Sequence, residues 1–298
     1  MNVKLIVLKG ILRWKRFLVK KRVHLIGEKI KIKREGFPAV EVYLYYPEEK
    51  QKVQLPVIFN VHGGAWIAGD ATGLDHQSQR LANALGVAVV NINYHKIDEK
   101  PFPYPQYEIR DVVKHLAKNH IEYGVDHSRF ILMGYSAGGH LCACVEQLLH
   151  EEGQLIAGQI LCYPFLDFTF GLKEEIEIKK KCESLGMVEE VFFTNLSQEE
   201  PLCSPGNQCI EKLKGTAPTM LITCGEDPLK IQAERYHERL LEANVQVQLN
   251  YYPESRHGFL EVDFEDSKKK PQEVLALKEE QSKCEADICK WISNLMNN

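Results

Sequence analysis

Three short segments of the sequence carry a serine, an acid and a histidine that together could perform acyl transfer. Ser136 stands in GYSAGG, Asp227 in TCGEDPL and His257 in YYPESRHGF, and each segment lies at the end of a predicted strand. A histidine can take the proton of a serine hydroxyl, and a carboxylate can hold that histidine in the required tautomer. These residue types are therefore those of nucleophilic catalysis.

The segment FILMGYSAGG has the pattern of a sharp turn between a strand and a helix. Close approach of neighbouring chain at such a turn leaves no room for Cβ atoms two positions before and after the serine, which suits Gly134 and Gly138. The helix that follows would point the Ala137 N–H at a developing oxyanion. Taken alone, the motif fits equally well a glycine-rich turn whose serine only caps the helix.

A second glycine-rich segment, PVIFNVHGGAW, follows an earlier apolar run. Gly63, Gly64 and Ala65 are small enough for their backbone N–H groups to lie along a substrate carbonyl, so we expect them to complete an oxyanion hole with Ala137. His62 precedes the serine and sits on this loop. We therefore expect it to brace the loop rather than act as the catalytic base.

Alternating strand and helix patterns must position these segments. Near-continuous apolar runs are typical of parallel strands that helices cover on both faces, whereas the first two strands alternate with period two, as in an antiparallel pair. Strands are predicted at 28–35, 39–46, 56–61, 86–93, 129–133, 158–163, 218–224 and 245–252, and helices at 75–85, 105–120, 137–150, 229–243 and 272–296. The fold class is α/β, with a mostly parallel eight-stranded sheet in which each candidate residue follows a different strand.

The 298 residues are predicted to form one domain. The interval 165–215 breaks the strand and helix rhythm, and we expect it and residues 1–27 to form a small lid. Residues 1–34 hold twelve Lys or Arg and one acid, Glu28, and mix these cations with apolar residues. A helix lying on a membrane surface is the alternative for the start of the chain, although we favour the lid.

Composition excludes several other classes of protein. The net charge is −4 and the chain beyond residue 34 is acidic, so no nucleic-acid partner is expected. Nine cysteines without a C-x-x-C pair or histidines at zinc spacing indicate free thiols in a reducing cytoplasm. Charged residues interrupt the first apolar stretch, and no run of eighteen apolar residues follows, so neither a secretory signal nor a membrane span is predicted.

Five motifs together resemble one family: HGGAW, PFPYPQ, GYSAGGHL, CGEDPL and RHGF. From about residue 40 to 260 the sequence resembles α/β-hydrolases of the hormone-sensitive-lipase-like carboxylesterase group. The resemblance implies Ser136 as nucleophile, His257 as base and Asp227 as orienting acid, with no metal or organic cofactor. Glu226 is the alternative acid, and the resemblance favours its neighbour. It also implies a lid over the acyl pocket and a small-molecule ester substrate, and it leaves the oligomeric state open.

Three departures from the family pattern bear on the substrate. This sequence has Ala65, Tyr135 and His95 at positions where the family usually has Gly, Asp and Arg. The pair Tyr135 and His140 resembles relatives that act on acetylated sugars, feruloyl esters and formylkynurenine. The expected activity is hydrolysis of short-chain acyl esters through an acyl-enzyme. The alternatives are an arylformamidase-type amide hydrolase and a ligand-binding protein on a hydrolase fold that has lost turnover.

Overall fold

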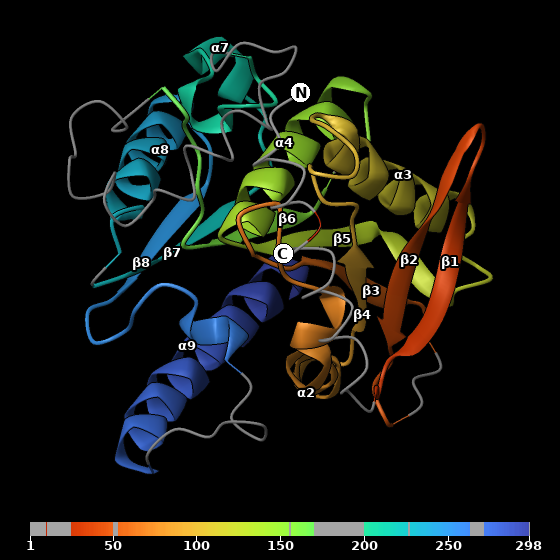
Figure 1. The fold of residues 1–298 in the computed structure, drawn as a ribbon, viewed down its shortest axis with the longest axis horizontal. Helices are drawn as coiled ribbons and strands as arrows, with labels where there is room; N and C mark the ends of the chain where they lie inside the picture. The colour runs from red at the N-terminus through yellow and green to blue at the C-terminus, as the bar shows by residue number, and fades with distance from the viewer. Residues whose placement is uncertain are drawn as a thin grey trace.

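The computed structural model describes residues 10, 25–49, 53–154, 156–169, 200–225, 227–262 and 271–297. Its centre is an eight-stranded sheet with the order β1-β2-β4-β3-β5-β6-β7-β8 (Figure 1). The strands are β1 Glu28–Arg34, β2 Phe37–Tyr45, β3 Leu55–Val61, β4 Ala88–Asn93, β5 Val125–Tyr135, β6 Gly158–Cys162, β7 Thr219–Cys224 and β8 Val247–Tyr252. β1 pairs antiparallel with β2 and β2 with β4, and every later pairing is parallel. The predicted fold class is thus confirmed.

Helices cover both faces of the sheet. They are α2 Asp75–Leu85, α3 Tyr104–Lys118, α4 Ala137–Glu151, α7 Ile210–Leu213, α8 Lys230–Glu242 and α9 Pro271–Asn297, with short 3-10 turns η1 Ala71–Leu74, η2 Pro205–Asn207 and η3 Phe259–Glu261. One buried apolar cluster joins α3, α4 and α8 to one face, and a second joins α2 and α9 to the other (Figure 1). β3, β6 and β7 are buried along their whole length, which explains their unbroken apolar sequences.

Strand boundaries differ from the predicted ones where backbone conformation intervenes. The prediction placed Gly86 in a strand, but it has φ 64° and ends α2, its N–H bonding to the Ala82 carbonyl. Asn244 has φ 58° and turns the chain before β8, which begins at Val247 rather than at 245. Residues with a left-handed backbone conformation commonly end helices. β4 and β8 therefore start later than their β-branched composition indicated.

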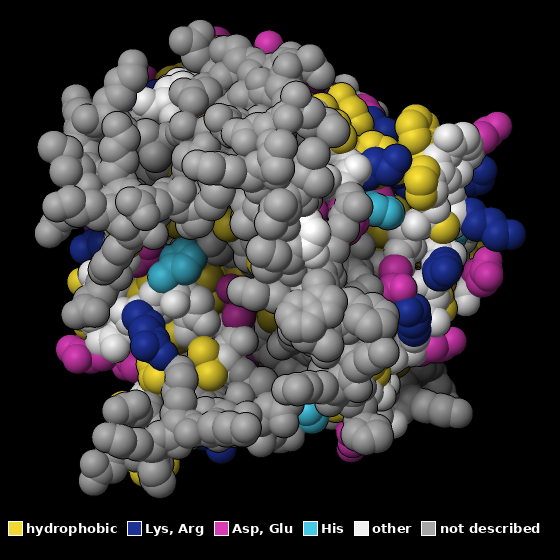
Figure 2. All heavy atoms as spheres, viewed as in Figure 1, with side chains coloured by type: hydrophobic (Ala, Val, Ile, Leu, Met, Phe, Trp, Pro, Cys, Tyr) yellow, Lys and Arg dark blue, Asp and Glu magenta, His cyan; other side chains and the backbone are white. Residues whose placement is uncertain are grey.

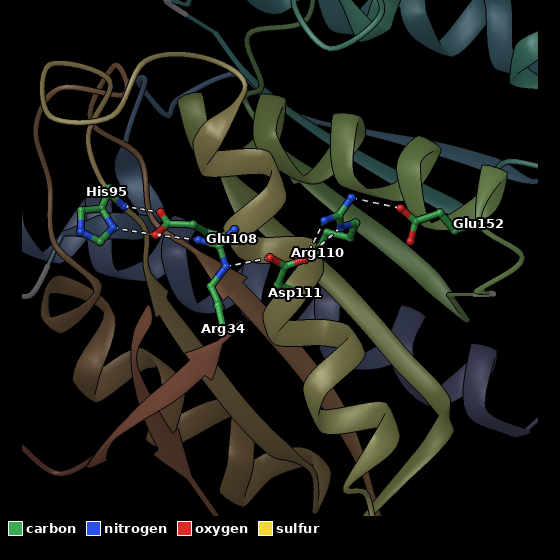
Figure 3. Close-up of polar contacts among 6 residues, drawn as sticks. All are labelled: Arg34, His95, Glu108, Arg110, Asp111 and Glu152. Carbon is green, nitrogen blue, oxygen red and sulfur yellow. Dashed lines mark hydrogen bonds and ion pairs between the residues drawn. The ribbon is translucent and has the colours of Figure 1, made fainter. Parts of the chain in front are cut away.

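A partly buried ion-pair network ties the antiparallel edge of the sheet to α3 (Figure 3). Arg34 Nε donates to Asp111 Oδ2 at 2.7 Å, and the Glu108 carboxylate accepts from both Nδ1 and the backbone N–H of His95, at 2.6 and 2.7 Å. The hydrogen bond to Glu108 raises the pKa of His95. The network therefore joins β1, the loop after β4 and α3.

The predicted lid segments, 1–27 and 165–215, fall largely outside the described residues and stay predictions. The described part of the second segment contains η2 and α7, which contact α8. On the face viewed in Figure 2, acidic and basic side chains of the described residues are interspersed. Within the described part of the chain, no helix has the length and apolar character that crossing a bilayer requires.

Candidate active site

Ser136 lies at the turn between β5 and α4 with a backbone conformation that L-residues seldom adopt, φ 52° and ψ −115°. The Ser136 N–H donates to the Cys162 carbonyl at 2.9 Å, and its carbonyl accepts from the His140 N–H at 3.1 Å. A Cβ on Gly134 would overlap the Gly138 carbonyl, and one on Gly138 would overlap the Val61 carbonyl. The glycines on either side are therefore required by the close approach of three chain segments.

A continuous series of hydrogen bonds joins Ser136, His257 and Asp227. Ser136 Oγ lies 2.8 Å from His257 Nε2, and His257 Nδ1 lies 2.7 Å from Asp227 Oδ2. A carboxylate only accepts, so Nδ1 carries the imidazole proton and Nε2 is left to accept from the serine hydroxyl. This arrangement has the polarity that proton removal from Ser136 requires.

The acid of this series is buried and held on both oxygens. The Asp227 side chain is 1% exposed, against 37% for His257. Besides the imidazole, the carboxylate accepts from the Leu229 N–H at 3.0 Å and lies 3.5 Å from the Cys224 thiol. Asp227 follows β7 and His257 follows β8, so parallel strand ends bring them to the serine after β5. Glu226, the alternative acid, lies outside the described residues.

The loop after β3 is a tight turn with three successive residues at positive φ: Gly64 at 114°, Ala65 at 49° and Trp66 at 61°. The Ala68 N–H donates to the Gly64 carbonyl at 2.8 Å and closes the turn. A Cβ on Gly64 would overlap the Ala68 backbone, which explains the glycine. The loop lies beside the serine turn, since Gly138 approaches Val61 at the end of β3.

The Gly63 N–H has a partner that sequence reasoning missed. It donates to Glu261 Oε1 at 2.8 Å, although the two residues are 198 positions apart. Burial raises the pKa of Glu261. The Gly63 N–H, one of the four predicted oxyanion donors, is therefore engaged within the protein. An acid four residues after a histidine is no sequence signal for such a contact.

His62 holds the loop from within. Its Nδ1 lies 2.6 Å from the Gly63 carbonyl oxygen and its Nε2 lies 2.8 Å from Lys96 Nζ. Its ring stacks on Tyr94, with centroids 4.4 Å apart and an interplanar angle of 12°. These contacts agree with the loop-bracing role that its place in the sequence suggested. Nothing in the sequence pointed to Lys96.

Tyr135 and His140, the pair that suggested particular substrates, are both buried. The Tyr135 hydroxyl donates to Gln77 Oε1 at 2.7 Å. His140 Nδ1 accepts from Trp66 Nε1 at 3.2 Å, its Nε2 lies 2.9 Å from the Cys203 carbonyl oxygen, and burial lowers its pKa to about 4. A neutral His140 thus joins the HGGAW loop to the segment after residue 200. Both side chains are engaged in hydrogen bonds within the protein, and the substrate class that the pair indicated stays a prediction.

Comparison with known proteins supplies the wider context. A family profile described as alpha/beta hydrolase fold matches residues 58–261. Arylacetamide deacetylase of Oryctolagus cuniculus is 26% identical over 78% of this chain and 75% of its own length. Carboxylesterase NlhH of Mycobacterium tuberculosis is 29% identical over 76% of this chain and 73% of its own. The solved structure of a Pyrobaculum calidifontis esterase superposes with a TM-score of 0.81 at 23% identity, covering 99% of this chain and 94% of that one, and this likeness concerns the fold alone.

Proposed function

Because this chain belongs to the α/β-hydrolase fold family, as its motifs predicted, we propose that it is a serine carboxylic-ester hydrolase acting on short-chain acyl esters. The observation that carries the proposal is the hydrogen-bonded series from Ser136 through His257 to Asp227. The relative named carboxylesterase supports the ester as the bond.

In the proposed reaction, His257 Nε2 takes the hydroxyl proton as Ser136 Oγ attacks the ester carbonyl carbon. Asp227 stabilises the imidazolium that forms. The imidazolium then protonates the departing alcohol, which leaves an acyl group on the serine. Water gives one proton to His257 and attacks the acyl carbonyl, and the proton returns to Oγ as the acid departs. Side chains and backbone of the chain supply every group, so the reaction needs no cofactor.

The negative oxygen of the tetrahedral intermediate accepts hydrogen bonds from backbone N–H groups. We assign Gly64, Ala65 and Ala137 as these donors, and we leave out Gly63 because its N–H already donates to Glu261. Ala137 opens α4 directly after the serine, so its N–H is not used within the helix. Removing one such donor typically reduces kcat by about 10²–10³.

An amide is the second candidate substrate, because one relative is named arylacetamide deacetylase. The same nucleophile and base can cleave an amide when the leaving amine is protonated. That name also supports a short acyl group, since acetyl is among the shortest. The third alternative, a binding protein without turnover, is disfavoured by the complete hydrogen-bonded series.

The proposal is tested by hydrolysis of p-nitrophenyl acetate, butyrate and decanoate by the wild type and by Ser136→Ala. We expect turnover on acetate and butyrate that the variant lacks. N-formylkynurenine and p-nitroacetanilide, assayed in parallel, test the amide alternative. Faster turnover on decanoate than on acetate refutes the short-chain preference. A folded wild type that hydrolyses none of these substrates refutes the proposed enzymatic function. The binding protein without turnover is then the remaining alternative.

A further inference from the structure

Lys96 is a buried lysine beside the candidate site. It lies in the loop after β4, and only 4% of its surface is exposed. Its Nζ lies 2.8 Å from His62 Nε2 and 2.9 Å from the Tyr94 carbonyl oxygen, and 4.0 Å from the centre of the Tyr94 ring. Lysine is almost never fully buried unless it is paired, so this placement requires a reason.

The contacts of Lys96 and of the Gly63 carbonyl agree on which nitrogen of His62 carries the proton. A lysine ammonium donates and does not accept, so His62 Nε2 must be the acceptor of the 2.8 Å contact. In the neutral ring the proton then resides on Nδ1, which donates to the Gly63 carbonyl at 2.6 Å. Gly69 permits this approach, because a Cβ there would overlap the Gly63 carbonyl oxygen.

The Gly63 carbonyl and the Gly64 N–H belong to the same peptide unit. A trans peptide is planar and its C=O and N–H point in opposite directions, so holding the oxygen fixes the direction of the N–H. The preceding peptide is held as well, since Tyr94 Oη donates to the His62 carbonyl at 3.2 Å and the Gly63 N–H donates to Glu261 at 2.8 Å. The backbone on the N-terminal side of Gly64 is therefore fixed by side chains from three segments.

We propose that Lys96 is a positioning residue for the oxyanion hole, at the cationic start of a hydrogen-bond chain that runs through His62 and the Gly63–Gly64 peptide to the Gly64 N–H. The inference rests on the proposed function, which makes that N–H an oxyanion donor. Hydrogen bonds in series polarise one another, so the cation also strengthens the final donor. Lys96 contacts no reacting atom in this role and acts only through His62.

Steady-state kinetics of Lys96→Met test the inference on the short-chain ester. The oxyanion forms after substrate binds, so we expect kcat to fall roughly tenfold with little change in KM, less than loss of a whole donor would cause. Lys100→Met is the matched control, because Lys100 lies in the same loop over the Tyr104 ring. Unchanged kcat in Lys96→Met, or an equal loss in Lys100→Met, overturns the role.

A double-mutant cycle tests whether the effect runs through His62. His62→Asn places an amide N–H near the Nδ1 position, where it can still donate to the Gly63 carbonyl, but it ends the link to Lys96. We expect Lys96→Met to reduce kcat in the wild type and to add nothing in the His62→Asn background. Equal effects in both backgrounds show that Lys96 acts by another route and overturn the proposed hydrogen-bond chain through His62.

Nitrogen-15 NMR of histidine-labelled protein provides a readout that does not depend on activity. The His62 signals are identified by their loss in His62→Asn. We expect a protonated Nδ1 and an Nε2 resonance that shifts in Lys96→Met but not in Lys100→Met. A protonated Nε2 in an active wild type overturns the inference while the proposed function stands. An inactive wild type overturns the proposed function, and the positioning role with it, whatever the spectrum shows.

Discussion

Replacing Ser136 by glycine should stabilise the protein relative to replacing it by alanine. Ser136 has φ 52° and ψ −115°, where a Cβ is in steric conflict with its own backbone. The surrounding hydrogen bonds hold it there, through the Cys162 carbonyl and the His140 N–H. Both variants lose the hydroxyl and its contact with His257 equally. Their difference therefore isolates the backbone strain.

The size of the difference follows from two opposing terms. A residue held in a sparsely populated backbone region carries about 1–3 kcal/mol of strain, which glycine relieves and alanine does not. Glycine loses more conformational freedom on folding, which costs about 0.5–1 kcal/mol relative to alanine. The net expectation is that Ser136→Gly is more stable than Ser136→Ala by about 1 kcal/mol. At an unstrained position the sign would be reversed.

Urea denaturation of the two variants, followed by circular dichroism, measures this difference in the free energy of unfolding. Glycine and alanine at Glu238, an exposed position inside α8, provide a control pair, for which alanine should be the more stable. Equal m-values in the two variants show that the comparison concerns stability alone. If Ser136→Gly unfolds at lower urea than Ser136→Ala, the backbone at this turn is unstrained and the reasoning is refuted.

Three further predictions concern the site and its surroundings. Asp227→Asn should lower kcat by about 10⁴ on a p-nitrophenyl ester with the fold retained, since an amide can favour the wrong imidazole tautomer, and a loss below tenfold would contradict its role. Gly138→Ala should destabilise the fold by about 3 kcal/mol in urea because its Cβ overlaps the Val61 carbonyl, whereas Gly73→Ala meets no neighbouring atom, needs no positive φ and should lose much less. Burial raises the pKa of Glu146 from 4.5 to about 7, so its contribution to stability is complete below pH 4.5 and is lost as pH rises through 7. Glu146→Gln should gain stability in urea relative to the wild type as pH rises from 4.5 to above 7, and parallel pH profiles would exclude this explanation.

The sequence patterns predicted the sheet well because each strand is governed by local composition. β3 and β7 read as unbroken apolar runs because both of their faces are buried. The boundaries were less accurate where a left-handed residue such as Gly86 ends a helix inside an apolar run. Hydrophobicity carries no information about that backbone angle.

The residues of the candidate site were predictable where motif and strand end coincide, and not elsewhere. Ser136 stands directly after the apolar end of β5 and His257 in the loop after β8, each with glycine nearby, and the structure places Ser136 Oγ 2.8 Å from His257 Nε2. Lys96 and Glu261 have no such signature, because their contacts with His62 and Gly63 depend on how loops 34 and 198 residues apart are packed. Their proposed roles, like those of Ser136 and His257, are open to measurement.

The hydrogen bond between Gly63 and Glu261 has a consequence for synthesis of the protein. It joins the loop after β3 to η3, which follows β8, across 198 residues. On the ribosome, the glycine loop emerges long before its carboxylate partner, and the histidine that faces Ser136 arrives 121 residues after the serine. A nascent chain therefore cannot assemble this site until the final strand has been translated and has joined the sheet. Catalytic activity in this molecule would report completion of the whole sheet, and a ribosome-released fragment that lacks β8 would carry an inert serine.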